Sequence, residues 1–170
     1  VHTAPSSAAA RNVEVQNIPS DYDDGRATMS KIFVDGKILT AADFDHYWPK
    51  PDFNPHLKKS GGSFIQVVVD KGVMTVEQAL KLLSDKSRLA YLPIYNYDVD
   101  YELTRGLPGA TCLRWLVLPF DRLSKSLMVA TANPFNRQAA IELEQAAKQR
   151  LLWYLTPPVD IVKALQKAFR

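Results

Sequence analysis

The chain has 170 residues, of which 46% are hydrophobic and 23% charged, and this is enough apolar material for one core of good size or two small ones. No apolar run approaches the roughly 20 residues that a transmembrane helix needs, so we expect no membrane span and no direct membrane insertion. The net charge of +3 is concentrated in residues 121–170, which carry eight Lys or Arg against four Asp or Glu. Scattered basic residues on helices are usually a solvated face.

Residues 1–27 combine Ala, Pro, Ser, Asn and Asp with few large apolar side chains. Such a composition cannot bury enough surface to fold, so we predict a flexible leader. The chain begins with Val rather than Met, and we expect that it was cut out of a longer protein. A helical subdomain is predicted over residues 28–87 and an α+β subdomain over residues 88–170.

The helical subdomain begins with apolar residues on both sides of Asp35-Gly36, a predicted turn. Thr40 then caps a helix over residues 41–48, with Asp43 three residues later as the acid of a capping box. Residues 49–62 hold three prolines and two glycines and are predicted to form a loop.

Residues 64–69 leave two alternatives open. Their β-branched composition favours a strand, whereas Gly72 is typical of the left-handed residue that follows a helix. Thr75 caps a further helix through Leu83. The order of apolar run, Asp-Gly turn, apolar pair, Thr and amphipathic helix occurs at residues 32–48 and again at 65–83, so we predict two copies of one helix-turn-helix unit.

The second half is predicted to be an α+β layer. Two short apolar runs around a polar linker indicate a hairpin, and further strands and helices flank it in sequence. The segments in chain order are an edge strand at 91–95, a helical turn from Asp98 to Arg105, the hairpin strands at 115–120 and 127–132, a helix from Asn133 or Asn136 to Gln149, a strand at 151–155 and a helix from Pro158 onward. We therefore expect an α+β fold: a helical repeat half, then a mixed three- or four-stranded sheet packed with helices.

Residues that could carry chemistry are sparse. The sequence has no Gly-x-x-x-x-Gly-Lys-Ser/Thr loop to hold nucleotide phosphates, and its three histidines are dispersed, so we expect no catalytic residues and no metal. Asp98, Asp100 and Glu102 alternate as metal ligands could, but acids at the capped start of a helix explain them. Cys112, the single cysteine, sits among apolar neighbours as a structural thiol would. No dense basic stripe with aromatic residues indicates nucleic-acid binding.

Several stretches carry a resemblance to a known family. They are Val-Val-Val-Asp-Lys-Gly-Val-Met-Thr-Val-Glu-Gln-Ala-Leu at 67–80, Tyr-Leu-Pro-Ile-Tyr-Asn-Tyr-Asp-Val-Asp-Tyr-Glu-Leu at 91–103, Val-Leu-Pro-Phe at 117–120 and Met-Val-Ala-Thr-Ala-Asn-Pro-Phe-Asn at 128–136, followed by a closing helix. In order and spacing they resemble the amino-terminal domain of type II secretion and type IV pilus assembly ATPases, the secretion ATPase E family. The resemblance covers residues 28–170.

The resemblance implies a docking and regulatory module rather than an enzyme. It implies two partners, a cytoplasmic part of an inner-membrane platform protein and the motor domain of the same chain. No cofactor is expected in this chain, because ATP and Mg²⁺ belong to the motor domain. The implied location is the cytoplasm, at the inner membrane through partners.

The resemblance also implies an alternative function, the sensing of cyclic di-GMP. Some family members bind it through repeats similar to Arg-Leu-Gly-x-x-Leu-Val-x-x-Gly, in which arginine supplies a planar cation and glycine permits close approach of the backbone. Alignment on Gly72 places Ser63–Ile65 at the leading Arg, Leu and Gly, and alignment on Gly36 places Ala27–Met29 there. The apolar skeleton of the motif is present, but its arginines are not.

Docking to a partner protein is thus the function that the sequence favours. Phe44, Tyr47 and Trp48 put much aromatic surface on one short helix, which either packs in the core or contacts another protein. We take these three as candidate contact residues. Lys163 and Lys167 on the last helix are the other candidates.

Overall fold

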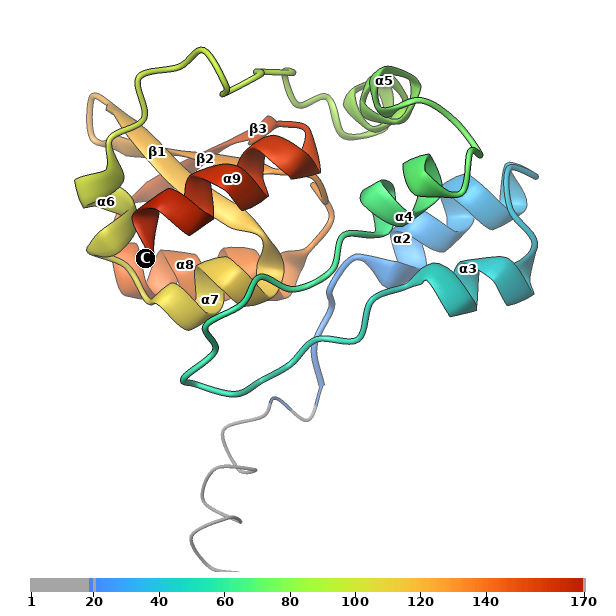
Figure 1. The fold of residues 1–170 in the computed structure, drawn as a ribbon, viewed down its shortest axis with the longest axis horizontal. Helices are drawn as coiled ribbons and strands as arrows, with labels where there is room; N and C mark the ends of the chain where they lie inside the picture. The colour runs from blue at the N-terminus through green and yellow to red at the C-terminus, as the bar shows by residue number, and fades with distance from the viewer. Residues whose placement is uncertain (1–18, 20, 170) are drawn as a thin grey trace, which may run out of the picture.

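The computed structural model describes residue 19 and residues 21–169, and it has the α+β fold predicted from the sequence. Figure 1 shows a helical half, in blue and green, beside a half in which helices cover a small sheet. None of the helices within the described residues is long and apolar enough to cross a membrane.

The helical half contains one continuous helical segment followed by three separate helices. These are α2 (Arg26–Ser30) continuing into the π-helical turn η1 (Lys31–Asp35), then α3 (Ala41–Tyr47), α4 (Phe64–Asp70) and α5 (Val76–Ser87). Residues 64–69 are thus helical and not a strand. The Gln66 backbone N–H donates to Ser63 Oγ at 3.2 Å, which caps the start of the helix, and Gly72 follows its end with a left-handed φ of 73°.

The start of this half differs from the prediction. Residues 1–18 and 20 of the predicted leader lie outside the described residues. Its last part, however, is joined to the fold: the Tyr22 ring lies 5.3 Å from the Phe53 ring, and α2 already begins at Arg26. The polar groups of this part serve as hydrogen-bond acceptors for other segments, a role that composition does not reveal.

The two predicted helix-turn-helix units are present, but they align differently from the sequence expectation. Thr40 and Thr75 both cap a helix, and Asp35 and Asp70 both end one. With these residues matched, Lys37 (φ 60°) stands where Gly72 stands in the second unit. Gly36 has a φ of −75° and is the residue before it, so alignment on the two glycines was wrong by one position.

The α+β half contains four helices and three strands. They are α6 (Tyr101–Arg105), α7 (Gly109–Trp115), β1 (Val117–Leu123), β2 (Ser126–Thr131), α8 (Arg137–Ala147), β3 (Arg150–Leu155) and α9 (Pro158–Ala168). The sheet order is β1-β2-β3, with β1 antiparallel and β3 parallel to β2. In Figure 1, α9 lies across one face of this sheet, and α7 and α8 lie below it.

Two sequence expectations for this half were wrong. The edge strand at 91–95 is reduced to one bridge between Tyr91 and Leu155, because Pro93 lacks the N–H that a ladder needs. Residues Gly109–Trp115 form a helix that was not predicted, and Trp115 ends this helix instead of starting a strand. Leu116, with a left-handed φ of 50°, makes the change from helix to strand.

Each half has its own buried core. The helical core contains Phe33, Phe44, Phe64 and Val68, and the other core is built on the sheet around Phe120 and Leu143. Leu155 at the end of β3 is fully buried, yet its side chain belongs to the helical core. The two halves therefore share a strand residue.

Candidate functional site

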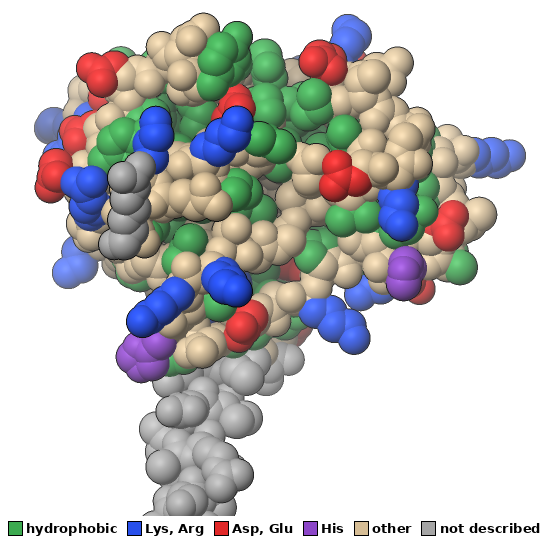
Figure 2. Space-filling model, in the orientation of Figure 1, with side chains coloured by type: hydrophobic (Ala, Val, Ile, Leu, Met, Phe, Trp, Pro, Cys, Tyr) green, Lys and Arg blue, Asp and Glu red, His purple; other side chains and the backbone are tan. Residues whose placement is uncertain are grey.

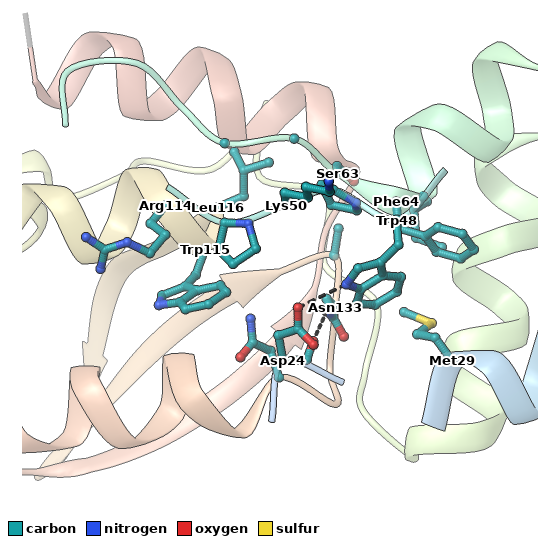
Figure 3. Close-up of a pocket in the computed structure, with 17 residues that line it drawn as sticks. Asp24, Met29, Trp48, Lys50, Ser63, Phe64, Arg114, Trp115, Leu116 and Asn133 are labelled. Carbon is teal, nitrogen blue, oxygen red and sulfur yellow. Dashed lines mark hydrogen bonds between the residues drawn. The ribbon is translucent and has the colours of Figure 1, made fainter. Parts of the chain in front are cut away.

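A small cleft lies where the helical half meets the α+β half (Figure 3). Asp24 joins its two sides. Its Oδ2 accepts a hydrogen bond of 2.9 Å from Trp48 Nε1 at the end of α3, and its backbone carbonyl accepts one of 2.8 Å from Asn133 Nδ2 just after β2. The cavity at the bottom of the cleft has a volume of about 50 Å³.

One carboxylate anchors the other side of the cleft. Glu142 on α8 accepts hydrogen bonds from four side chains, and three of these donors lie on α7. The donors are Thr111 (3.1 Å), Arg114 (3.3 Å), Trp115 (3.2 Å) and, on α8 itself, Gln138 (2.8 Å). The ion pair with Arg114 is largely buried, since the two side chains are only 7% and 19% exposed.

Arg114 also holds the loop of residues 49–62 over the cleft. Its Nε donates to the Asp52 carbonyl at 2.7 Å, its Nη2 donates to the Asn54 carbonyl at 3.2 Å, and its guanidinium lies 5.0 Å from the Phe53 ring. The other end of the loop is bound through Gly61 N, which donates to the Leu113 carbonyl at 2.8 Å. The walls of the cleft are thus occupied with structural hydrogen bonds.

The chemistry open to this cleft is narrow. Ligand pockets usually measure about 300–1,000 Å³, whereas a cavity of about 50 Å³ has room for about one or two water molecules. Within the part of the chain that the structure describes, no three His, Cys, Asp or Glu side chains are grouped as metal ligands. Cys112 is buried as predicted, and burial raises the pKa of its thiol to about 12.

The positions that would read a cyclic dinucleotide lie at one wall of this cleft. Ser63–Ile65 at the start of α4 line it directly. The corrected alignment of the two units makes Thr28–Ser30 their equivalents, in place of Ala27–Met29. Neither set contains an arginine. Arg26, which is nearby, is paired with Asp45 at 2.7 Å.

The five candidate contact residues are placed very differently. Phe44 and Trp48 are 2% and 7% exposed and pack on each other and on Phe64 in the helical core. A buried side chain cannot meet a partner while the helix stays folded, so their aromatic surface serves the core. Tyr47 is half-buried, with the Lys71 ammonium 5.9 Å from its ring centre. Lys163 and Lys167 are exposed on α9.

Comparison with known proteins identifies the second half. Residues 87–170 match the family model of the MshEN domain. These residues are therefore similar to MshEN domains. The match agrees with the resemblance found in the sequence, to the amino-terminal domain of the type II secretion and type IV pilus ATPases. No curated protein matches the chain.

Solved structures similar to the chain extend the likeness beyond residues 87–170. A structure of MshE with cyclic di-GMP is 17% identical, with a TM-score of 0.56, and the match covers 82% of this chain and 97% of that one. The N-terminal domain of XpsE is 13% identical, with a TM-score of 0.55 and coverage of 88% and 98%. At such identities the likeness shows a shared fold alone.

Reasoning from sequence missed two exposed aromatic residues of the second half. Tyr91 and Tyr95 are 48% and 72% exposed. Both precede α6: Tyr91 forms an isolated bridge, and Tyr95 lies in a turn. A signal was present in the sequence: Tyr91, Pro93 and Tyr95 alternate with the apolar Leu92 and Ile94, and Ile94 is buried at 3% exposure. Alternation of this kind separates an inner from an outer face.

Proposed function

We propose that this chain is a non-catalytic docking and regulatory module of a secretion or pilus assembly ATPase, and that it binds a cytoplasmic part of an inner-membrane platform protein. The observation that carries the proposal is the outward face of α9, where Lys163 and Lys167 are exposed and form no ion pair among the described residues. A helix face that the fold does not use is available to another protein.

The cleft between the two halves supports docking over catalysis. Its walls are held by structural hydrogen bonds, and its cavity of about 50 Å³ is smaller than the usual ligand pocket. In the proposed arrangement ATP and Mg²⁺ bind in a motor domain of the same chain, and the module is held in the cytoplasm at the inner membrane by its partner.

A binding titration tests this function. The purified 170-residue chain is titrated with the cytoplasmic domain of the platform protein from the same organism, and we expect a saturable complex of micromolar affinity. Tyr47→Ala tests the half-buried candidate of the helical half, and a loss of affinity would place part of the contact there. The complete absence of a complex at concentrations of about 100 μM, far above the expected affinity, would refute the proposed function.

Cyclic di-GMP sensing is the second candidate function. It is favoured by the two helix-turn-helix units and by the likeness to MshE, whose structure contains this ligand. Titration with cyclic di-GMP, with ATP as the control nucleotide, decides it. Micromolar binding of the dinucleotide alone would make the module a second-messenger sensor that reads its ligand without the leading arginines.

A further inference from the structure

The last helix has two clearly different faces. Ile161 and Leu165 are fully buried in the core on the sheet, and Ala168, near α6, is 5% exposed. On the outer side, Val159, Lys163 and Lys167 are all exposed and follow one another at intervals of four residues. This spacing places the three side chains in one stripe, with about 6 Å of helix rise between neighbours.

The stripe has an apolar end. Val159 is 44% exposed at the start of α9, and Tyr91 bridges to Leu155 just before the helix. Burial first, and then the nearby charges of Asp160, Glu77 and Tyr95, raise the pKa of Tyr91. The bridge to Leu155 places Tyr91 just before the first turn of α9, and Tyr95 follows it four residues later. Exposed tyrosines next to an aliphatic side chain are typical of the energetically important centre of a protein interface.

The other end of the stripe is basic. Lys163 and Lys167 have no carboxylate within ion-pair distance among the described residues, and Asp160, one turn earlier, is the acid whose pKa Lys163 influences. Figure 2 shows further Lys and Arg side chains on this face over the loop of residues 49–62. Lys58 and Lys59 are exposed in that loop.

We propose that the surface formed by Tyr91, Tyr95, Val159, Lys163 and Lys167, here called the α9 surface, is the docking face, and that its occupant is an acidic amphipathic helix of the platform protein. This inference rests on the proposed function and specifies its partner. Two carboxylates one turn apart on the partner helix face Lys163 and Lys167, and an apolar side chain beyond them packs between the tyrosines. Opposite charge at one end and apolar contact at the other fix the direction of the partner helix.

The neighbouring helix argues for a protein segment rather than an anionic membrane as the occupant. α6 lies against the end of α9, where Arg105 Nε donates to the Ala168 carbonyl at 3.1 Å. The exposed acids Asp98, Asp100 and Glu102 lie on or just before α6. A flat anionic bilayer would meet these carboxylates together with the lysines, whereas a helix about 10 Å wide can lie on the stripe alone.

The test reverses the charge of the stripe. In the Lys163→Glu, Lys167→Glu double variant we expect affinity for the platform cytoplasmic domain to fall at least tenfold, which corresponds to about 1.4 kcal/mol. The matched control is Lys81→Glu, Lys86→Glu, which changes the same charge at exposed positions of α5 and should leave affinity within about twofold of the unmodified chain. Tyr95→Ala removes a side chain that is 72% exposed, so it should weaken binding without affecting folding.

Four outcomes are distinguishable in the same titrations. Weaker binding by the α9 double variant alone, restored when acidic residues of the partner are changed to lysine, supports the inference. Full binding by that variant would overturn the inference while leaving the docking function intact. Absence of binding by the unmodified chain would overturn both. Co-sedimentation of the chain with phosphatidylglycerol vesicles, lost in the α9 double variant and unaffected by the platform domain, would replace the protein helix by a lipid surface.

Discussion

Glu142 offers the sharpest test of how the cleft is held together. In Glu142→Ala, four donors lose their acceptor, and the Arg114 guanidinium is left with only its two bonds to loop carbonyls. Removing one partner of a buried ion pair costs about 3–5 kcal/mol of folding free energy. The Glu142 side chain is 19% exposed, so water can enter the site, and we take the lower end, about 3 kcal/mol.

A loss of about 3 kcal/mol corresponds to a fall in Tm of about 6–12 °C for a chain of this size. Urea denaturation and thermal melting of the purified chain measure it. Glu144→Ala on the same helix is the control, because Glu144 is exposed and its side chain makes no hydrogen bond to a described residue. Glu142→Gln should fall between the two, since the amide keeps the shape but offers one acceptor oxygen. If the two alanine variants agree within about 1 kcal/mol, Glu142 is not the anchor described above.

Two further predictions concern titratable side chains. Cys112 should react with thiol reagents only when the protein unfolds, because a thiol of pKa about 12 is protonated at neutral pH; rapid labelling of the native protein would contradict its burial. Tyr97 donates a 2.6 Å hydrogen bond to Asp121, which raises the pKa of Tyr97 from 10.0 to about 12 and lowers that of Asp121. The bond therefore stabilises the fold between about pH 4 and pH 10 and is lost as Asp121 becomes protonated in acid or Tyr97 ionises in base. The difference in unfolding free energy between the wild type and Tyr97→Phe should be largest near pH 7 and should decrease toward pH 3 and pH 12; a difference that does not vary with pH would exclude this bond as its cause.

Local signals predicted much of the fold. Thr40, Thr75 and Asn136 each cap a helix through a side-chain oxygen, and such caps are visible in sequence because they depend on residues three positions apart. The hairpin, the strand at 151–155 and the final helix follow from runs of apolar residues in the same way. The family resemblance rested on the order of these elements, and the match of residues 87–170 confirms it.

Features that depend on tertiary contact could not be predicted in this way. The helix at Gly109–Trp115 is short, and its side chains find their partner in Glu142, which is distant in sequence. Phe44 and Trp48 fit a core or an interface equally well by periodicity, and only the packing against Phe64 assigns them to the core. Whether Lys163 and Lys167 contact a partner stays a prediction.

Leu155 has a consequence for how this chain folds. β1 and β2 are joined by a tight turn and can pair early, but β3 must wait for the crossover through α8 before it pairs in parallel with β2. Because the Leu155 side chain is part of the helical core, we expect that core to be complete only after β3 is in place. A chain cut at residue 87 would lack the helical core, so Leu155 would be exposed. Ala90 and Leu92 form backbone hydrogen bonds with Leu155, and in the cut chain α5 would no longer precede them. The family match at residues 87–170 therefore leaves out the helical core into which Leu155 packs.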